Sequence, residues 1–412
     1  DTSAAVDGLE PITRLTPDTP FPESESPLAP AWRSPAPVER PESVEQQRWP
    51  GHCYKSAWPL SETYFIAAYS FDRLIGEAKA NKANMFGLYL VDAFGNKELL
   101  YRDLNLSSLW PMPLKPRPMP PALQPAAVAG APDTGTYFLQ DVYKSMPQVA
   151  PGEVKRLRII QVLPKSTSGA NNPMVGLANA SPGKQVLGTV PVEEDGSAYF
   201  TAPARKALEF QALDAQGRAI QMMRSVTYLQ PGENASCVGC HEPRLAAPPT
   251  HTGILAQRRE PSKIEPAPDG GCPLSYPILV QPVLDAHCIQ CHGGETPKGP
   301  EGKPIRLEGG IEGHYTYSYN ALAPRVPFSS WGQGVFPAGN CEPLIQPGAF
   351  GARASKLMDM LLEGHHDVKL TDDDMDRLTT WMDANALFYG TFNFDDQARQ
   401  QRGERIAGPD LE

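Results

Sequence analysis

The sequence predicts a multidomain protein whose β-rich N-terminal and middle parts precede an α-helical C-terminal domain. Three observations predict this class. The 412 residues include 45 prolines and 35 glycines, which favour short elements and turns over long helices. Short runs rich in β-branched and aromatic residues alternate with turns up to residue 230, and helical spacing of apolar residues follows after residue 272. Two CxxCH motifs lie in the second half of the chain.

Shifts in composition divide the chain into six segments. Stretches rich in proline and small polar residues predict extended arms and linkers, because they lack a sustained apolar period. The predicted segments are an extended arm at 1–50, propeller-blade-like strands with a Pro-rich linker at 51–135, a β-sandwich-like domain holding the first CxxCH motif at 136–250, a linker at 251–271, a helical domain holding the second motif at 272–395, and a charged, extended tail at 396–412.

The strands are predicted from alternation and turn residues. Residues 84–103 contain a strand, an Asp-led turn at 92–96 and a second strand, a pattern typical of a β-propeller blade. One blade cannot close a propeller. These strands are therefore either a remnant that packs on other elements or part of a propeller whose other blades lie on a different chain. Residues 185–229 hold four or five short strands with turns at 195–196 and 216–217, which suits a β-sandwich.

The C-terminal part shows helical signals. Residues 276–292 predict a helix that runs into the second motif, and the helix at 355–363 ends at Gly364. A further helix begins after Thr371, its N-cap residue, with Asp374 at the capping-box position. The order of helix, motif, long loop and closing helix is that of a small cytochrome c-like domain.

Charge and hydropathy exclude two classes of partner. The formal net charge of −10 argues against a nucleic-acid-binding protein. No run of 18 apolar residues exists, so we expect no transmembrane segment. No signal peptide is visible in this numbering, and Asp1 is compatible with a processed N-terminus.

The two CxxCH motifs predict covalent haem. In c-type haem attachment, two thiols three residues apart bind the vinyl groups and the adjacent histidine ligates the iron. A zinc ribbon needs closer CxxC pairs than the 47 residues between Cys240 and Cys288, and a redox dithiol needs a βαβ context that is absent. We expect two haem c groups, attached through Cys237, Cys240 and His241, and through Cys288, Cys291 and His292.

The sequence offers a second axial ligand for only one of the two haems. The stretch before the last predicted helix contains His365 and His366, and we favour His365 because Gly364 frees the backbone before it. A bis-histidine haem suits electron transfer rather than ligand activation. For the first haem, the sixth position is either open to a small molecule or filled by one of three histidines, which are His52, His251 and His314.

The three remaining cysteines allow further predictions. Haem c is attached outside the cytoplasm, where disulfides persist, so we expect a periplasmic or extracellular protein and a disulfide between Cys272 and Cys341. Cys53 is either a buried thiol or, together with His52, a zinc ligand.

Several stretches, among them "GLYLVDAFGNKELLYRD", "VLGTVPVEEDGSAYF", "SCVGCHEPR" and "GHHDVKLTDDDMDRLTTWMDANALFYGT", resemble the hydrazine synthase alpha subunit family over about residues 50–395. The resemblance implies a β-propeller, a β-rich middle domain with one haem and a C-terminal cytochrome c domain with a second. In that family the first haem is the proposed catalytic centre and the second relays electrons. There the motif histidine binds zinc and a tyrosine four residues later ligates the iron, but this sequence has Leu245 at that place.

Three functions are compatible with these patterns. The favoured one is a dihaem cytochrome that carries electrons in a periplasmic or cell-surface assembly, with redox proteins or other subunits as partners. The second is an oxidoreductase that acts on a small nitrogen compound at the first haem, for which no catalytic acid or base can be singled out. The third is a structural component whose haems wire a filament or surface layer.

Overall fold

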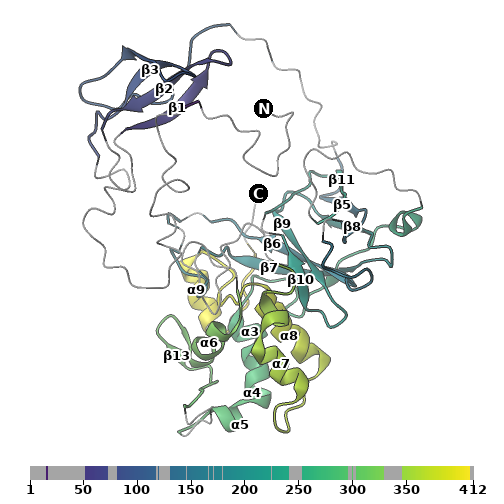
Figure 1. Cartoon of the computed structure of the whole chain (residues 1–412). Coiled ribbons are helices and arrows are strands. Elements are labelled where there is room, and N and C mark those ends of the chain that lie inside the picture. The colour runs from purple at the N-terminus through teal and green to yellow at the C-terminus, as the bar shows by residue number, and fades with distance from the viewer. Residues whose placement is uncertain are drawn as a thin grey trace. The chain divides into compact units, whose positions relative to one another are not determined.

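The chain divides into two compact units, Asp1–Ala122 and Leu123–Glu412 (Figure 1). In the described residues the strands form several sheets, and the helices lie in the second unit. The computed structural model describes residues 15–16, 52–72, 81–116, 119, 130–144, 146–165, 167–169, 171–178, 180–223, 225–240, 253–295, 299, 303–328 and 346–408.

A four-stranded antiparallel sheet makes up most of the described part of the first unit. Its strands pair in chain order and are β1 (Cys53–Pro59), β2 (Tyr64–Ser70), β3 (Gly87–Asp92) and β4 (Lys97–Tyr101). The Asp92 carboxylate accepts hydrogen bonds from the backbone N–H groups of Phe94 and Asn96, each 2.9 Å long, and so closes the turn between β3 and β4. The strand, turn and strand predicted within 84–103 are confirmed.

Both faces of this sheet are apolar. One face buries Phe65, Tyr69 and Val91, and the other packs Ala68 against Met85 and Phe86. An antiparallel sheet usually keeps one polar face toward water, so this composition is typical of a layer that is covered on both sides. The interpretation as a propeller blade is compatible with it and stays a prediction.

Two sheets of the second unit form a β-sandwich. The larger has the order β10-β9-β6-β7-β12, and in the smaller, β11-β5-β8, strand β11 is parallel to β5. Tyr137 and Phe200 of the small sheet share one apolar core with Ile159 and Leu208 of the large sheet. The strands are β5 (Thr134–Leu139), β6 (Arg156–Val162), β7 (Lys184–Pro191), β8 (Ala198–Pro203), β9 (Leu208–Leu213), β10 (Ala219–Met222), β11 (Asn234–Cys237) and β12 (Glu265–Pro266).

The segment predicted as a linker, 251–271, contributes regular structure. A 3₁₀ helix, η3 (Leu255–Arg258), lies in it, and β12 pairs with β7. The Asp195 carboxylate accepts from the backbone N–H of Leu255 at 2.8 Å, which ties the segment to the turn before β8. Side-chain and backbone bonds therefore hold this Pro-rich stretch on the sandwich.

Seven helices in the described residues complete the second unit. They surround a core of aromatic side chains that includes Tyr276, Tyr319, Trp381 and Phe388, all fully buried. The helices are α3 (Tyr276–Leu279), α4 (Gln281–His287), α5 (Ile289–His292), α6 (Tyr317–Leu322), α7 (Lys356–Glu363), α8 (Asp372–Asp383) and α9 (Phe394–Gln401). Within the described residues no helix is long and apolar enough to cross a membrane.

Helix boundaries follow the capping residues. Thr371 and Asp374 form the predicted capping box at the start of α8, with each side chain bound to the other's backbone N–H. Helix α9 was not predicted, because the charged stretch after residue 393 suggested an extended tail. The Asn393 side chain caps α9, and its buried Gln400 donates to the carbonyl groups of Pro273 and Leu274, so this part of the chain is helical.

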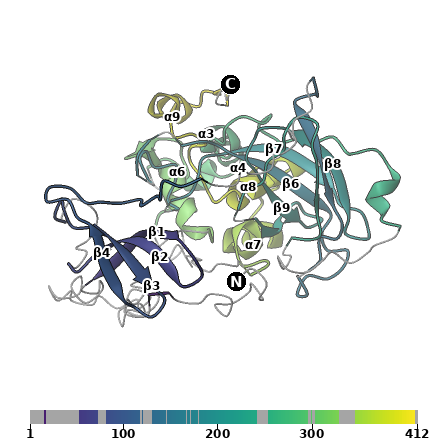
Figure 2. The same cartoon turned by 90° about the horizontal axis from the view of Figure 1, so that it is seen from above.

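A buried ion pair joins the sandwich to the helices. Arg158 of β6 and Asp383 at the end of α8 are 1% and 0% exposed, with Nη1 and Oδ2 3.0 Å apart. The Asp383 carboxylate also accepts from the backbone N–H groups of Ala219 and Ala352, and Gln211 donates to its backbone carbonyl. The end of α8 accordingly lies against β6 and β9 in both views of the ribbon (Figures 1 and 2).

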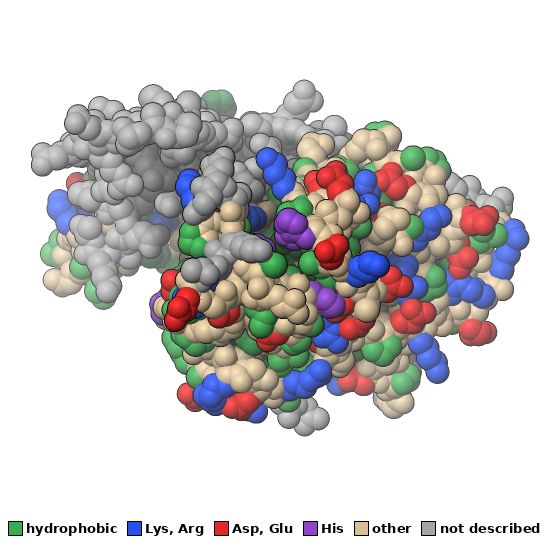
Figure 3. Space-filling model, turned by 90° about the horizontal axis from the view of Figure 1, so that it is seen from below, with side chains coloured by type: hydrophobic (Ala, Val, Ile, Leu, Met, Phe, Trp, Pro, Cys, Tyr) green, Lys and Arg blue, Asp and Glu red, His purple; other side chains and the backbone are tan. Residues whose placement is uncertain are grey.

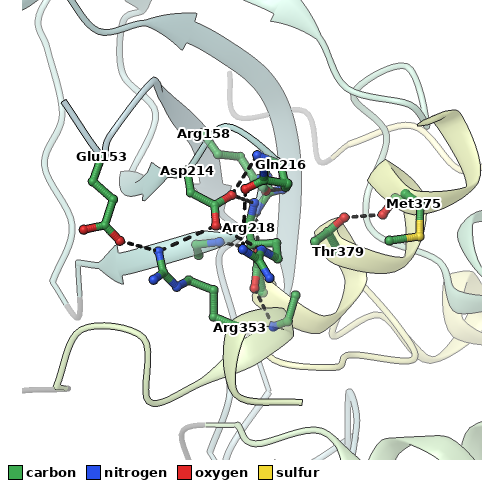
Figure 4. Close-up of polar contacts among 12 residues, drawn as sticks. Glu153, Arg158, Asp214, Gln216, Arg218, Arg353, Met375 and Thr379 are labelled. Carbon is green, nitrogen blue, oxygen red and sulfur yellow. Dashed lines mark hydrogen bonds and ion pairs between the residues drawn. The ribbon is translucent and has the colours of Figure 1, made fainter. Parts of the chain in front are cut away.

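A second group of charged side chains, most of them more exposed than this pair, lies at the same junction. Arg353, on η6 (Gly351–Ala354), contacts Glu153 at 2.8 Å and Asp214 at 3.6 Å, and Asp214 also binds Arg218 (Figure 4). These side chains come from the sandwich and from the helical part, so they extend the same junction toward solvent.

Replacing Arg158 with methionine is expected to destabilise the protein by about 3–5 kcal/mol, because the Asp383 carboxylate would stay buried without its cation. Chemical denaturation followed by circular dichroism measures the loss. Arg156→Met is the matched control, since Arg156 lies on the same strand and pairs with the exposed Glu265; it is expected to cost about 0–1 kcal/mol. Equal losses in the two variants would contradict a central role for the buried pair.

Candidate haem-binding sites

The second CxxCH motif occupies one helical turn at the end of α4 and in α5. The backbone N–H of Cys288 donates to Leu284 at 2.8 Å, and that of His292 donates to Cys288 at 3.0 Å. The thiol of Cys288 is partly buried against the aromatic core, whereas Cys291 is exposed. Residues three and four apart lie on one side of a helical turn, so both thiols and His292 can reach one flat group.

The structure brings the rings of His365 and His292 close together. Their ring centroids are 6.1 Å apart and their planes differ by 20°. An imidazole binds a metal ion through a ring nitrogen, in the plane of the ring and about 2.0–2.1 Å from the ion, so two imidazoles on opposite sides of one ion have centroids about 6 Å apart. The spacing of this pair is therefore compatible with an iron between the two rings, and these residues fit a haem here.

A short loop between α7 and α8 carries His365. Gly364 (φ 99°) and His366 (φ 50°) turn the chain on either side of it, and the N–H of Val368 donates to the His365 carbonyl at 3.2 Å. Partial burial, followed by the neighbouring His366 and His292, lowers the pKa of His365. The neutral imidazole is favoured as a result, and that is the form that ligates a metal.

Histidine side chains gather on the face of the second unit that carries these helices. Figure 3 shows this face, which lies toward the bottom of Figure 1 around α4, α5 and α7. Met360 and Leu362 of α7, just before the His365 loop, are large apolar side chains that are exposed. A flat apolar group bound between the histidines could cover such side chains.

The first motif follows β11 at the edge of the sandwich. Cys237 ends β11 and its carbonyl accepts from Gln140 at 3.0 Å, while Cys240 packs with Cys237 against the sandwich core. Gly239 sits so close to Lys144 that an added Cβ would lie 2.5 Å from the Lys144 Cβ, so this turn has no room for a side chain. His241, Leu245 and His251 lie outside the described residues.

Two of the four motif thiols have a raised pKa. Burial, reinforced at Cys240 by Cys237 and Asp141, raises the pKa of Cys240 to about 12, and burial raises that of Cys288 to about 11. Reactive dithiols have a lowered pKa, because the thiolate is the nucleophile. Cys240 and Cys288 therefore lack the lowered thiol pKa of a reactive cysteine.

Two other predicted ligands, Cys53 and His52, belong to the first unit. Cys53 packs with Ala68, Met85 and Phe86, and burial raises the pKa of its thiol. The ring of His52 lies 6.1 Å from that of Tyr69. The described residues contain no group of three or more His, Cys, Asp or Glu side chains that could hold a metal ion, and the zinc site stays a prediction.

Two further predictions involve the second unit. Cys272 is partly buried, but Cys341 lies outside the described residues, so the disulfide between them stays a prediction. His314 is exposed in the turn between β13 (Ile311–Glu312) and β14 (Tyr315–Thr316), where its carbonyl accepts from Tyr389.

Comparison with known proteins identifies the middle of the chain. Residues 152–242 match the family model of the hydrazine synthase alpha subunit middle domain. Hydrazine synthase of Kuenenia stuttgartiensis has a similar fold, with a TM-score of 0.56 at 20% sequence identity, over 88% of this chain and 56% of that chain. This chain thus spans little more than half the length of the hydrazine synthase chain. No curated protein gives a sequence match.

The region similar to the hydrazine synthase alpha subunit runs from just before β6 to the end of the first motif and includes Cys237, Cys240 and His241. The resemblance seen in the sequence is confirmed for this domain and for the fold. The second motif and His365 lie outside residues 152–242, so the hydrazine synthase family model does not cover them.

Sequence reasoning missed a contact that adjoins the second motif. His287, directly before Cys288, has its Nε2 3.2 Å from Oδ2 of Asp374. The sequence signals were a histidine beside the motif and an acidic first turn in α8, but nothing in the spacing of 287 and 374 predicts their contact.

The capping box makes stability depend on pH in the acid range. Partial burial favours the protonated form of Asp374, but hydrogen bonds from Thr371 and the nearby His287 outweigh it and lower the pKa of this carboxyl. The ionised Asp374 carboxylate therefore stabilises the fold fully at pH values above its unfolded pKa of about 3.9. This stabilisation is lost as the pH falls through the lower pKa that the carboxyl has in the folded protein.

Asp374→Asn is accordingly expected to be less stable than the wild type at pH 7, and the difference shrinks as the pH falls from about 3.9 through the lower, folded pKa of Asp374. Urea denaturation at a series of pH values measures this. Asp373→Asn is the control, because Asp373 is more exposed and pairs with Arg377 instead of capping the helix. A difference for Asp374→Asn that persists unchanged in acid would contradict the assignment.

Proposed function

We propose that this chain is a hydrazine synthase-like dihaem c-type cytochrome subunit that carries electrons within a larger assembly outside the cytoplasm. One haem c would be attached by Cys237 and Cys240 with His241 as ligand, and the other by Cys288 and Cys291. The observation that carries the proposal is the pair of imidazole rings of His292 and His365, which have nearly parallel planes and centroids 6.1 Å apart.

The protein groups at the second site suit outer-sphere electron transfer. Haem iron supplies one-electron chemistry when bound. His292 and His365 would both ligate the iron and so exclude a substrate from it. Cys291 and four of the seven residues of the His365 loop are exposed, which would leave the group accessible to a redox partner.

The backbone of His292 is held by the segment around Leu307. Its carbonyl accepts from the backbone N–H of Leu307 at 2.8 Å, and Gln281 at the start of α4 donates to the Leu307 carbonyl at 3.0 Å. A ligand fixed in this way changes position little between oxidation states, and small reorganisation favours fast electron transfer.

A second function is favoured by the position of the first motif. It lies inside the residues that match the hydrazine synthase alpha subunit middle domain. The alternative is therefore oxidation or reduction of a small nitrogen compound at the first haem, with the second haem as the electron relay. The two functions differ in whether the first iron has a free position.

Optical and EPR spectra with and without carbon monoxide test the proposal. The wild type is expected to carry two covalent haems per chain and to show a low-spin second haem that carbon monoxide binds slowly. His365→Ala is expected to convert that haem to a form that binds carbon monoxide readily, whereas His366→Ala keeps the low-spin signal.

Chains without covalent haem would overturn the proposal, as would a His365→Ala variant with wild-type spectra. A first haem that is high-spin and binds carbon monoxide in the wild type would favour the alternative, and small nitrogen compounds would then be tested as substrates at that haem.

A further inference from the structure

A polar contact connects the two segments that carry His292 and His365. It joins Nε2 of His287, the last residue of α4, to Oδ2 of Asp374 in the first turn of α8 at 3.2 Å. Both side chains are mostly buried, 27% and 16% exposed, so water competes only partly for this contact.

Asp374 is in turn bonded to Thr371, the residue that follows the His365 loop. The same Oδ2 atom accepts from the backbone N–H of Thr371 at 2.9 Å and from its hydroxyl at 2.7 Å. Thr371 follows directly on the loop, 364–370. A shift of Asp374 therefore moves the end of the loop.

His287 is tied as closely to His292. Cys288 follows it, and backbone bonds from Cys288 to Leu284 and from His292 to Cys288 continue the helical turn between them. Since His287 and His292 belong to one rigid stretch, a contact at His287 fixes where the His292 ring lies relative to α8.

The His365 loop has little other anchorage. None of the residues 364–370 is buried: four are exposed and three are intermediate. Only Leu370, at the end of the loop, packs against the aromatic core, so the loop is positioned mainly by its ends. One end is Gly364 after α7, and the other is the Thr371 and Asp374 cap that His287 contacts.

We propose that His287 is a positioning residue that, through Asp374, holds His365 opposite His292 and thereby keeps the second haem in its bis-histidine state. This rests on the proposed bis-histidine haem. His287 touches neither iron ligand, and its effect runs through the α8 cap. His287, directly before the CxxCH motif, thus fixes the position of the loop that carries His365.

Carbon monoxide binding to the reduced dihaem protein tests this role. Carbon monoxide can bind a bis-histidine iron only after one imidazole leaves, so its rate reports how often His365 is released. The relevant kinetic phase is the one that becomes fast in His365→Ala. Loss of one partly buried hydrogen bond is expected to make this phase about two- to tenfold faster in His287→Ala.

Three variants separate positioning from general destabilisation. His287→Gln retains an N–H donor and is expected to bind carbon monoxide more slowly than His287→Ala. Lys356→Ala removes an exposed side chain at the start of α7 and is expected to match the wild type. In a double-mutant cycle, His287→Ala combined with Asp374→Ala should give less than the product of the two separate rate increases.

The proposal is overturned if His287→Ala binds carbon monoxide at the wild-type rate, or if the effects of His287→Ala and Asp374→Ala multiply as independent changes do. It is also overturned if His287→Gln is as fast as His287→Ala. Failure of the proposed function is distinct, since it would appear in the wild type as a second haem without low-spin bis-histidine spectra.

Discussion

The contact between Arg158 and Asp383 is the constraint on which the second unit depends. A guanidinium and a carboxylate that are both removed from water are stable only when each keeps its partners. Here the partners come from β6, β9, β10, α8 and η6, so the sandwich and the helices meet at one polar point inside an otherwise apolar interface. Aromatic packing around Trp381 then fixes the direction in which α8 leaves that point.

Helix α8 links this constraint to the candidate haem site. Its 12 residues make it about 18 Å long, and its two ends have different tasks. Asp383 anchors the C-terminal end in the sandwich. Thr371 and Asp374 cap the N-terminal end, where the chain leaves the His365 loop and where His287 makes its contact. His365 is thus connected, through its loop, to a helix whose other end is buried against the sandwich.

Local signals made much of this predictable. Asp92 and the residues after it encode a turn in a few positions, and Thr371 with Asp374 encodes a helix start in four. The spacing of the two CxxCH motifs alone predicts covalent haem, which stays a prediction. The placement of His365 near His292 followed from the order of elements expected in a cytochrome c-like domain, and the structure brings those two rings together.

Contacts between residues far apart in the chain could not be predicted from the sequence. Arg158 and Asp383 are 225 positions apart, and each resembles an ordinary surface charge when its own neighbours are considered. Likewise, β12 was predicted to be part of a linker, because a two-residue strand is too short to show an alternating apolar pattern. Helix α9 was predicted to be part of the tail, because its buried residues are glutamines rather than apolar residues. Polar side chains that are buried by partners far along the chain give no local sign of burial.

The separation between Arg158 and Asp383 also bears on how the molecule is built. A chain that emerges from its N-terminus completes all of β5 to β10 before it supplies the carboxylate that the Arg158 guanidinium needs. Until then the middle layer carries an unmatched internal cation, which disfavours early closure of that layer. Complete closure of the sandwich around Arg158 is therefore expected to follow synthesis of the last third of the chain, which supplies Asp383.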